Sequence, residues 1–509
     1  MHVPSKRRMV LAGVLTVGVG VAISVVGTGW AGASTQPSRT LTADTRFYVD
    51  PHSEAAKQAV TDLQNRDFAD AAAMAKLASW PEATWFTKGT PSQVNSQVRD
   101  LAHRAATEHA VPVLVAYDIP LRDCSQYSAG GAQSDADYQA WIAALANGLG
   151  NSKAVVILEP DALANLPSDC GQDPTGAISA ARMADMSYAI DVLEAKPAVS
   201  VYLDAGNSQW HSTGDMAARL IQAGVARSQG FFLNVSNYQP TDQSDQYGTW
   251  VSKCIWFATM GPSWAAGHTD WCASQYYSNS APNDGLPGDA VSPTDASTWH
   301  WTDLWFDQNV GTPPADQLTH FVVDTSRNGQ GAWTPPAGKY TGDPQTWCNP
   351  PNRGVGARPT AATGVALVDA YFYVKTIGES DGQCNRSIPG GTIDPEYGIV
   401  DPAAGAWWPD MAHTLAHNAN PALTFNPRPF WGKAPLTRLR AGQRRGARAL
   451  GWFGRVLGKF QARSGNFWQG QVVLRSASSG VKTHAAQPSP AQRRRGRAWT
   501  TLLADAPRL

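Results

Sequence analysis

The chain has 509 residues, in which 41 Lys and Arg residues balance 41 Asp and Glu residues. A single α/β barrel commonly runs to about 250 residues or more, so one large domain can absorb most of this length. The charges are unevenly distributed, because residues 34–426 carry 21 basic against 40 acidic residues. An acidic body argues against nucleic acid as the partner.

The first 33 residues have the features of a secretory signal peptide. Lys6, Arg7 and Arg8 precede an apolar run that extends to about Val26, and AGA at 31–33 supplies small residues for cleavage after Ala33. We therefore expect a secreted protein with a short N-terminal segment at 34–45. An uncleaved membrane anchor is the alternative, because the apolar run is long. After cleavage we expect no contact with a membrane.

Apolar runs of strand length recur along the chain, and Ala-rich stretches precede most of them. The predicted strands are 46–49, 111–116, 154–158, 199–203, 230–235, 320–323 and 370–374, and the clearest helices are 93–108, 136–149 and 178–193. Strand and helix in alternation predict an α/β fold with a parallel sheet covered by helices. Polar residues cluster directly after the strands. We therefore expect a barrel whose carboxyl-end loops form the site.

Two long stretches interrupt this pattern, at about 241–314 and about 382–407. Both are rich in Gly, Pro, Asp, Ser and Trp, and we expect both to be irregular. Loops of this length in a compact domain are usually functional, so we interpret them as lids over a site. Tolerated surface insertions are the alternative.

Two runs lead from an apolar strand directly into acidic side chains. They are YDIPLRDC at 117–124 and VVILEPD at 155–161. Apolar surroundings raise the pKa of a carboxyl group, which then holds a proton near neutral pH and can donate it to a leaving oxygen. Two carboxyl groups are the minimum equipment for cleaving a glycosidic bond. A single Asp at the end of a strand usually has no catalytic role, because strand ends commonly carry polar residues. The two runs together favour a catalytic site.

In these residues the chain resembles glycoside hydrolase family 6, the cellulases that comprise cellobiohydrolases and endoglucanases. The family's signatures correspond to VLVAY at 113–117 with RDCS at 122–125 and GG at 130–131, and to LEPDAL at 158–163. Further segments fit in order: YLDAG at 202–206, NVSNY at 234–238, DTSRNG at 324–329, WCN at 347–349, VK at 374–375 and GESDG at 378–382. The resemblance spans about 46–426. It implies a distorted barrel with fewer than eight regular strands, and we expect no cofactor.

All six cysteines lie in the acidic part of the chain: Cys124, Cys170, Cys254, Cys272, Cys348 and Cys384. An even number in an exported protein suggests disulfides, for which fifteen pairings are open. The resemblance implies Cys124 with Cys170 and Cys348 with Cys384, which leaves Cys254 with Cys272. Metal binding is the alternative, but neither a CxxC pair nor a His-rich cluster accompanies the cysteines, so we expect no metal.

The resemblance also implies an inverting mechanism, in which two carboxyl groups stand about 6.5 to 9.5 Å apart to admit a water. Asp161 matches the family's acid, and burial together with a nearby Asp123 would raise its pKa. For the base we predict Asp381, with Asp123 as a modulator of pKa and an indirect base acting through waters. Asp204 matches a supporting carboxylate of the family, and a structural or capping role is its alternative.

A groove for sugar rings needs aromatic platforms flanked by hydrogen-bonding side chains, and this chain has 20 Trp residues. The resemblance implies stacking on three Trp residues, a Tyr that crowds the cleaved ring, and polar partners for hydroxyl groups. The predicted substrate-binding residues are Tyr117, Trp85, Trp210, Asn237, Trp347, Lys375 and Glu379. The chain departs from the family pattern at Asn207, where many relatives carry His, and at Thr213, where fungal exo-acting relatives carry Trp.

The stretch at 382–407 is longer than the corresponding part of family endoglucanases and resembles loops that roof a cellobiohydrolase tunnel. The insertion at about 254–305 points the same way. We therefore expect a monomeric cellobiohydrolase that releases cellobiose from non-reducing ends of cellulose, with an endoglucanase as the alternative. A non-catalytic carbohydrate-binding protein is the alternative from another class. The retention of all four predicted catalytic carboxylates argues against it.

Residues 427–509 differ from the rest of the chain. They carry 17 Lys and Arg residues against one acidic residue, Asp505. Three interpretations are open: a disordered basic tail, a polyanion-binding extension, and out-of-frame translation of a GC-rich gene, which we favour. The segment shows neither the strand pattern nor the linker of a cellulose-binding module. We therefore place the catalytic domain at 46–426.

Overall fold

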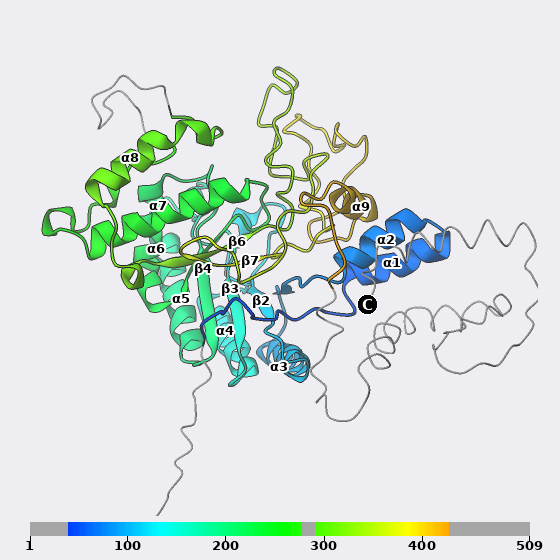
Figure 1. Ribbon diagram of the computed structural model, residues 1–509, viewed down its shortest axis with the longest axis horizontal. Helices are drawn as coiled ribbons and strands as arrows, with labels where there is room; N and C mark the ends of the chain where they lie inside the picture. Colours follow the sequence, from blue (N-terminus) through cyan, green and yellow to red (C-terminus); the bar gives the residue numbers. More distant parts are fainter. Residues whose placement is uncertain (1–38, 277–290, 427–509) are drawn as a thin grey trace, which may run out of the picture. The chain divides into compact units, whose positions relative to one another are not determined.

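The computed structural model describes residues 39–276 and 291–426 (Figure 1). The predicted signal peptide, the first part of the predicted segment 34–45 and the predicted basic tail lie outside the described residues. Within the described ranges, no helix is both long and apolar enough to cross a membrane.

In the described part of the chain, seven parallel strands form one sheet in which the spatial order follows the chain from β1 to β7. The strands are β1 (Thr84–Phe86), β2 (Val113–Ala116), β3 (Ala154–Leu158), β4 (Val199–Asp204), β5 (Gly230–Leu233), β6 (His320–Asp324) and β7 (Val368–Phe372). The two edges meet where the Ala83 N–H donates to the Tyr373 carbonyl at 2.8 Å. Beside it, the Trp85 indole donates to the Val374 carbonyl at 2.8 Å. The predicted distorted barrel with fewer than eight strands is confirmed.

The strands are buried on both faces, which explains why they read as continuous apolar runs. Side chains alternate along each strand between an inner and an outer core. In β2, for example, Val113 and Val115 belong to the inner cluster, whereas Leu114 and Ala116 belong to the outer cluster. The outer cluster joins the sheet to the surrounding helices.

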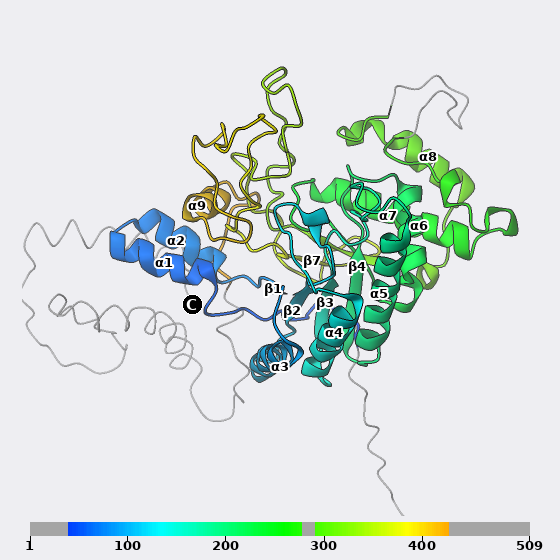
Figure 2. The same ribbon diagram turned by 180° about the vertical axis from the view of Figure 1, so that it is seen from behind.

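Helices pack on the outside of the sheet, as Figures 1 and 2 show from opposite sides. They are α3 (Pro91–Thr107), α4 (Asp135–Leu149), α5 (Ala177–Glu194), α6 (Thr213–Ala223), α7 (Thr241–Thr259) and α8 (His300–Asn309). The start of α3 follows from sequence, because Thr90 and Gln93 form a capping box around Pro91. Short 3-10 helices are η1 (Asp123–Ser125), η2 (Val225–Arg227), η3 (Ser263–Ala265), η4 (Thr269–Trp271), η5 (Ala296–Thr298) and η6 (Ala315–Gln317).

A second, smaller core lies beside the barrel. It joins α1 (Glu54–Asn65), α2 (Phe68–Leu77) and α9 (Pro409–His417) to residues that follow β7, such as Tyr373 and Ile377. In both views α1 and α2 lie next to α9, although more than 300 residues separate them in the chain. This core supports the segment that carries Asp381.

Two predictions about elements were wrong, and one strand was missed. The expected strand at 46–49 is only an isolated bridge between Phe47 and Val111, whereas the three-residue strand β1 was not predicted. The stretch at 241–314 is not irregular throughout, because it contains α7 and α8. The polar composition of α7 concealed a face of buried Trp, Val, Cys and Phe residues. Residues 382–407 contain neither helix nor strand, as predicted.

Candidate active site

A cleft of about 830 Å³ lies at the carboxyl ends of the strands. Its walls come from the segments that follow β2, β3, β4, β5 and β7, together with β1 and the connection between β6 and β7. Nine of the predicted site residues line it: Trp85, Tyr117, Asp123, Asp161, Trp210, Asn237, Trp347, Lys375 and Asp381. Parallel strands bring residues that are 296 positions apart in the chain into one cleft, as with Trp85 and Asp381.

Two of the predicted site residues, Asp204 and Glu379, are not part of the cleft lining. Asp204 is buried, and its Oδ2 accepts the N–H groups of Leu163 (3.0 Å) and Ala164 (2.7 Å). It thereby ties the loop after β4 to the loop that carries Asp161. This geometry supports the structural alternative for Asp204, combined with an electrostatic effect on Asp161.

Asp161 directly follows the turn Glu159-Pro160 at the end of β3 and has a φ of +67°. The Tyr117 hydroxyl donates to its Oδ2 at 3.5 Å. Burial raises the pKa of Asp161 well above its usual range, and the charges of Asp204 and Asp123 raise it further. A carboxyl group in such surroundings holds its proton near neutral pH and can donate it to a leaving oxygen.

Glu159 is fully buried next to Asp161 and does not line the cleft. Its Oε2 accepts the N–H groups of Asp118 (2.9 Å) and Ile119 (3.0 Å). Burial raises its pKa to about 7, although these hydrogen bonds oppose the change. Glu159 therefore fixes the start of the loop that carries Asp123.

Asp123 lies in η1, where residues 123–125 all have positive φ values. Its Oδ2 accepts the Ser128 N–H at 2.7 Å, and the disulfide Cys124–Cys170 anchors the turn. Burial raises the pKa of Asp123 above its usual value, although the hydrogen bond from Ser128 and the charge of Arg122 oppose this. The other disulfides join Cys254 to Cys272 and Cys348 to Cys384. These are the three pairs expected from sequence.

Asp381 faces the opposite electrostatic environment. Its Oδ2 accepts from Arg327 Nη1 (3.0 Å) and from the Tyr238 hydroxyl (3.2 Å), while Lys375 Nζ lies 3.6 Å from Oδ1. Burial would raise the pKa of Asp381, but the charges of Arg327 and Lys375 outweigh burial and lower it. Asp381 is therefore a permanent negative charge in the wall of the cleft.

Sequence reasoning missed Arg327, whose side chain is completely buried. Its guanidinium lies 4.3 Å from the ring centre of Tyr238 and also donates to the Ser236 carbonyl. The segment DTSRNG was part of the resemblance, but no role was assigned to its arginine. An Arg three residues after the end of a buried apolar strand is a signal that could have identified it, because a charged side chain is rarely buried without a partner.

The family model of glycosyl hydrolases family 6 matches residues 42–419. The chain belongs to this family. Endoglucanase A of Cellulomonas fimi is 33% identical over 374 residues, which are 73% of this chain and 61% of that protein. A protein of Aspergillus niger named probable 1,4-beta-D-glucan cellobiohydrolase C is 29% identical over 406 residues, covering 74% of this chain and 77% of that protein.

A solved structure of a family 6 enzyme is also similar. It is the endoglucanase Cel6 from Mycobacterium tuberculosis in complex with methyl-cellobiosyl-4-deoxy-4-thio-β-D-cellobioside. The sequences are 34% identical, the TM-score is 0.53, and the match covers 74% of this chain and 98% of that structure.

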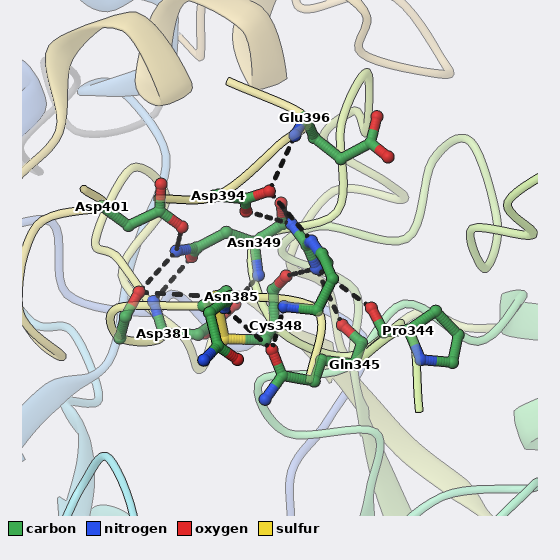
Figure 3. Close-up of polar contacts among 12 residues, drawn as sticks. Pro344, Gln345, Cys348, Asn349, Asp381, Asn385, Asp394, Glu396 and Asp401 are labelled. Atoms are coloured by element: carbon green, nitrogen blue, oxygen red, sulfur yellow. Dashed lines mark hydrogen bonds and ion pairs between the residues drawn. A yellow bond between two sulfur atoms is a disulfide. The ribbon is translucent and has the colours of Figure 1, made fainter. Parts of the chain in front are cut away.

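The residues that line the cleft show whether the two stretches expected to be lids reach it. Residues 382–407 are all described, and none of them lines the cleft. From the described part of the insertion at 254–305, Thr294 lines it. The expectation that the stretch at 382–407 roofs the cleft is therefore wrong, because this stretch packs behind Asp381 instead, against residues 343–349 (Figure 3).

Two other loops that border the cleft contact each other. Gln126 and Ser128 line it from one side, and Thr346 and Trp347 line it from the other. Between them, Gln345 Nε2 donates to the Tyr127 hydroxyl at 3.2 Å. The Tyr127 and Trp347 ring centres lie 5.9 Å apart. We name this contact the Tyr127 bridge.

Proposed function

We propose that this protein is a secreted cellulase that hydrolyses internal β-1,4-glucosidic bonds with inversion. The observation that carries the proposal is the contrast between two carboxyl groups in one cleft. The environment raises the pKa of Asp161 and lowers that of Asp381. Pairs of carboxyl groups whose pKa values are pushed apart are typical of acid and base or charge-stabilising roles in glycoside hydrolysis. Disulfides support an extracellular location.

In this proposal Asp161 protonates the leaving oxygen. Two carboxylates compete for the role of the base that activates water. Asp381 remains a prediction for this role, but its donors satisfy Oδ2 and lower its proton affinity. Asp123 has a raised pKa and lines the cleft, and a base works best when its pKa approaches the working pH. The surroundings therefore favour Asp123 as the proton acceptor, through an intervening water, and Asp381 as the charge that stabilises the cationic transition state.

Aromatic side chains support a glucan as the substrate. Trp85, Trp210 and Trp347 lie along the cleft, and Trp347 is 37% exposed. Their rings offer flat apolar surfaces to sugar faces, while Asn237 and Lys375 offer hydrogen bonds to hydroxyl groups. The relatives named endoglucanase A and probable 1,4-beta-D-glucan cellobiohydrolase C support the same substrate class.

Cleavage with inversion should be visible in the first product formed. Because a water attacks directly from the face opposite the leaving group, a β-linked chain should release the α-anomer. Proton NMR during the first minutes of hydrolysis of a cello-oligosaccharide measures the anomeric ratio before mutarotation. An initial excess of the β-anomer would exclude this mechanism.

Internal cleavage is preferred for two reasons. The sequence identity to endoglucanase A of Cellulomonas fimi (33%) is higher than the identity to the Aspergillus niger protein named probable 1,4-beta-D-glucan cellobiohydrolase C (29%), and the stretch at 382–407 does not line the cleft. One observation favours the second candidate, a cellobiohydrolase. The Tyr127 bridge connects two loops that border the cleft, and a closed loop pair would confine a chain end.

Product analysis separates these two candidates. An endoglucanase should lower the viscosity of carboxymethylcellulose early and release a ladder of oligomers, whereas a cellobiohydrolase should release mainly cellobiose. If the protein is an endoglucanase, replacing Tyr127 with Ala should change its rate of carboxymethylcellulose hydrolysis by no more than about twofold, since the substrate already enters from the side. A rise of about tenfold would mean that the bridge closes the cleft, and would support the cellobiohydrolase.

A further inference from the structure

Asn349 is fully buried and contacts Asp381 in two directions (Figure 3). The backbone N–H of Asn349 donates to Asp381 Oδ2 at 3.0 Å. In return, the backbone N–H of Asp381 donates to Asn349 Oδ1 at 2.7 Å. Both the main chain and the carboxylate of Asp381 are therefore fixed by one residue.

The amide nitrogen of Asn349 is held on the other side. Asn349 Nδ2 lies within hydrogen-bond distance of Ser380 Oγ (3.0 Å), the Gly382 carbonyl (2.9 Å) and Asp401 Oδ2 (2.9 Å). Ser380 and Gly382 flank Asp381 in the chain. The φ of Asn349 is +40°, a conformation that Asn adopts more readily than most residues.

Only one orientation of this amide satisfies its surroundings. Its oxygen faces the N–H donor of Asp381, and its nitrogen faces the carboxylate of Asp401. A rotation by 180° would place donor against donor and acceptor against acceptor, and buried polar groups without partners are costly. Asp401, together with the Gly382 carbonyl and the Asp381 N–H, therefore sets the orientation of the Asn349 amide.

Asp401 lies beside a buried ion pair between Arg386 and Asp394. Arg386 Nε donates to Asp394 Oδ1 at 3.0 Å, and Arg386 Nη2 donates to the Asn349 carbonyl at 3.1 Å. Carboxylate oxygens of Asp394 and Asp401 lie within 4.8 Å of each other, and Tyr397 lies close to both. Within the described ranges, Asp401 Oδ1 is buried without a hydrogen-bond partner.

These contacts are consistent with a shared proton and not with a cation site. Burial and the charge of the neighbouring Asp394 carboxylate together raise the pKa of Asp401 to about 7, although the hydrogen bond from Asn349 opposes the change. A proton on Asp401 Oδ1 would make that atom a donor, and the neighbouring Asp394 carboxylate is the acceptor within reach. The third potential ligand, Cys384, is bonded to Cys348, and Arg386 already supplies the positive charge.

We propose that Asn349 is a positioning residue for Asp381, and that Asp401 orients the amide of Asn349 for this role. The inference rests on the proposed function, in which Asp381 is the permanent negative charge of the cleft. The alternative is that Asn349 only anchors the disulfide-bonded loop.

Replacing Asn349 with Asp tests the proposal. The substitution keeps the acceptor oxygen and tolerates positive φ, but it places an oxygen where Nδ2 faced Asp401. At pH 7.5 we expect kcat on a soluble cello-oligosaccharide to fall about 10- to 100-fold with KM within about threefold, because small displacements of a reacting group are costly. At pH 5 the new carboxyl group is protonated and donates to Asp401, so most of kcat should return.

Matched variants separate positioning from anchoring. Asn385→Asp makes the same change in the neighbouring segment, where Asn385 Nδ2 donates to the Gly391 carbonyl at 2.8 Å. The kcat of this variant should stay within about twofold of that of the parent. The double variant Asn349→Asp with Asp401→Asn exchanges the two groups, so that an amide at 401 again faces a carboxylate at 349. At pH 7.5 its kcat should be at least about tenfold higher than that of Asn349→Asp alone.

The outcomes that overturn the proposal are a kcat within twofold of the parent from pH 5 to 8, a loss independent of pH, or an equal loss in Asn385→Asp. If Asn349→Asp does not fold, as judged by circular dichroism, the same kcat and pH measurements on Asp401→Asn decide the question.

A crystal structure of the Asn349→Asp variant at pH 7.5 tests the proposal without measuring activity. The Asp381 carboxylate should be displaced, and an unmoved carboxylate would contradict the proposal even if the parent does not cleave the chosen substrate. An inactive parent would instead contradict the proposed function.

Discussion

Replacing Asp161 with Asn should lower kcat on cellulose by about 10²- to 10⁴-fold while leaving substrate binding largely intact, because general acid catalysis contributes about this much. The Asn side chain fills the same space and keeps the Tyr117 contact, but it has no proton to give. Initial rates on cellulose and equilibrium binding of cellotetraose by calorimetry measure the two effects separately. Hydrolysis within about threefold of the parent would exclude Asp161 as the acid.

Two controls sharpen this experiment. An aryl cellobioside with a good leaving group needs little protonation, so the variant should lose much less activity on it. Asp118 is a buried carboxyl group in the same region, its pKa is raised to about 6 mainly by burial, and it does not line the cleft. The kcat of Asp118→Asn on cellulose should therefore stay within about threefold of that of the parent. An equal loss in this control would point to disturbed packing instead of lost acid catalysis.

Replacing Arg327 with Met should lower the free energy of unfolding by about 3 to 5 kcal/mol at pH 7.5, because it leaves the Asp381 carboxylate buried without its strongest partner. The pKa of Asp381 is lowered in the native state, so the ion pair contributes stability above the unfolded pKa, and this contribution is lost as pH falls through the folded pKa. In the variant, burial raises the pKa of Asp381. The penalty should therefore shrink at pH 4.5, as urea unfolding at both pH values would measure.

The double variant Arg327→Met with Asp381→Asn is the matched control for this prediction. It removes both charges and should recover most of the stability that the single variant loses, because the pair and not the packing of the arginine stem dominates. Activity should remain low in both variants. A double variant no more stable than the single one, or a penalty independent of pH, would show that the loss comes from the packing of Arg327 on Tyr238.

The sequence predicted the barrel well because its strands are buried on both faces. Runs such as VVIL at 155–158 can only be buried strands or helices, and their length and flanking acids favour strands. Strand β1 has three residues, of which Thr84 and Trp85 are only half-buried, so it carries no such pattern. Helix α7 was missed because its first half is polar and because Gly248 is unfavourable in the interior of a helix. In the structure Gly248 lies where the helix packs closely on the Phe321 ring, so the site needs a residue without a side chain.

The candidate site was predictable where a short motif contains the functional residue, as with Asp123, Asp161 and Asp381. It was not predictable where function depends on contacts between distant segments. Arg327 acquires its role from Asp381, which is 54 residues away, and Asn349 acquires its role from Asp401, which is 52 residues away. Loop length also failed as an indicator of a lid, because length does not determine whether a loop folds over the cleft or behind it.

The meeting of the two sheet edges has a consequence for how a glucan is held. Within the described residues, the Ala83–Tyr373 hydrogen bond is the sole backbone link between the segments of β1 and β7, and the Trp85 indole supplements it. Trp85 belongs to one edge, whereas Lys375 and Asp381 follow the other. A sugar chain that stacks on Trp85 and bonds to Lys375 therefore bridges the gap in the barrel wall. Under the proposed function, the substrate would add a contact between the two edges at the point where the backbone links them least.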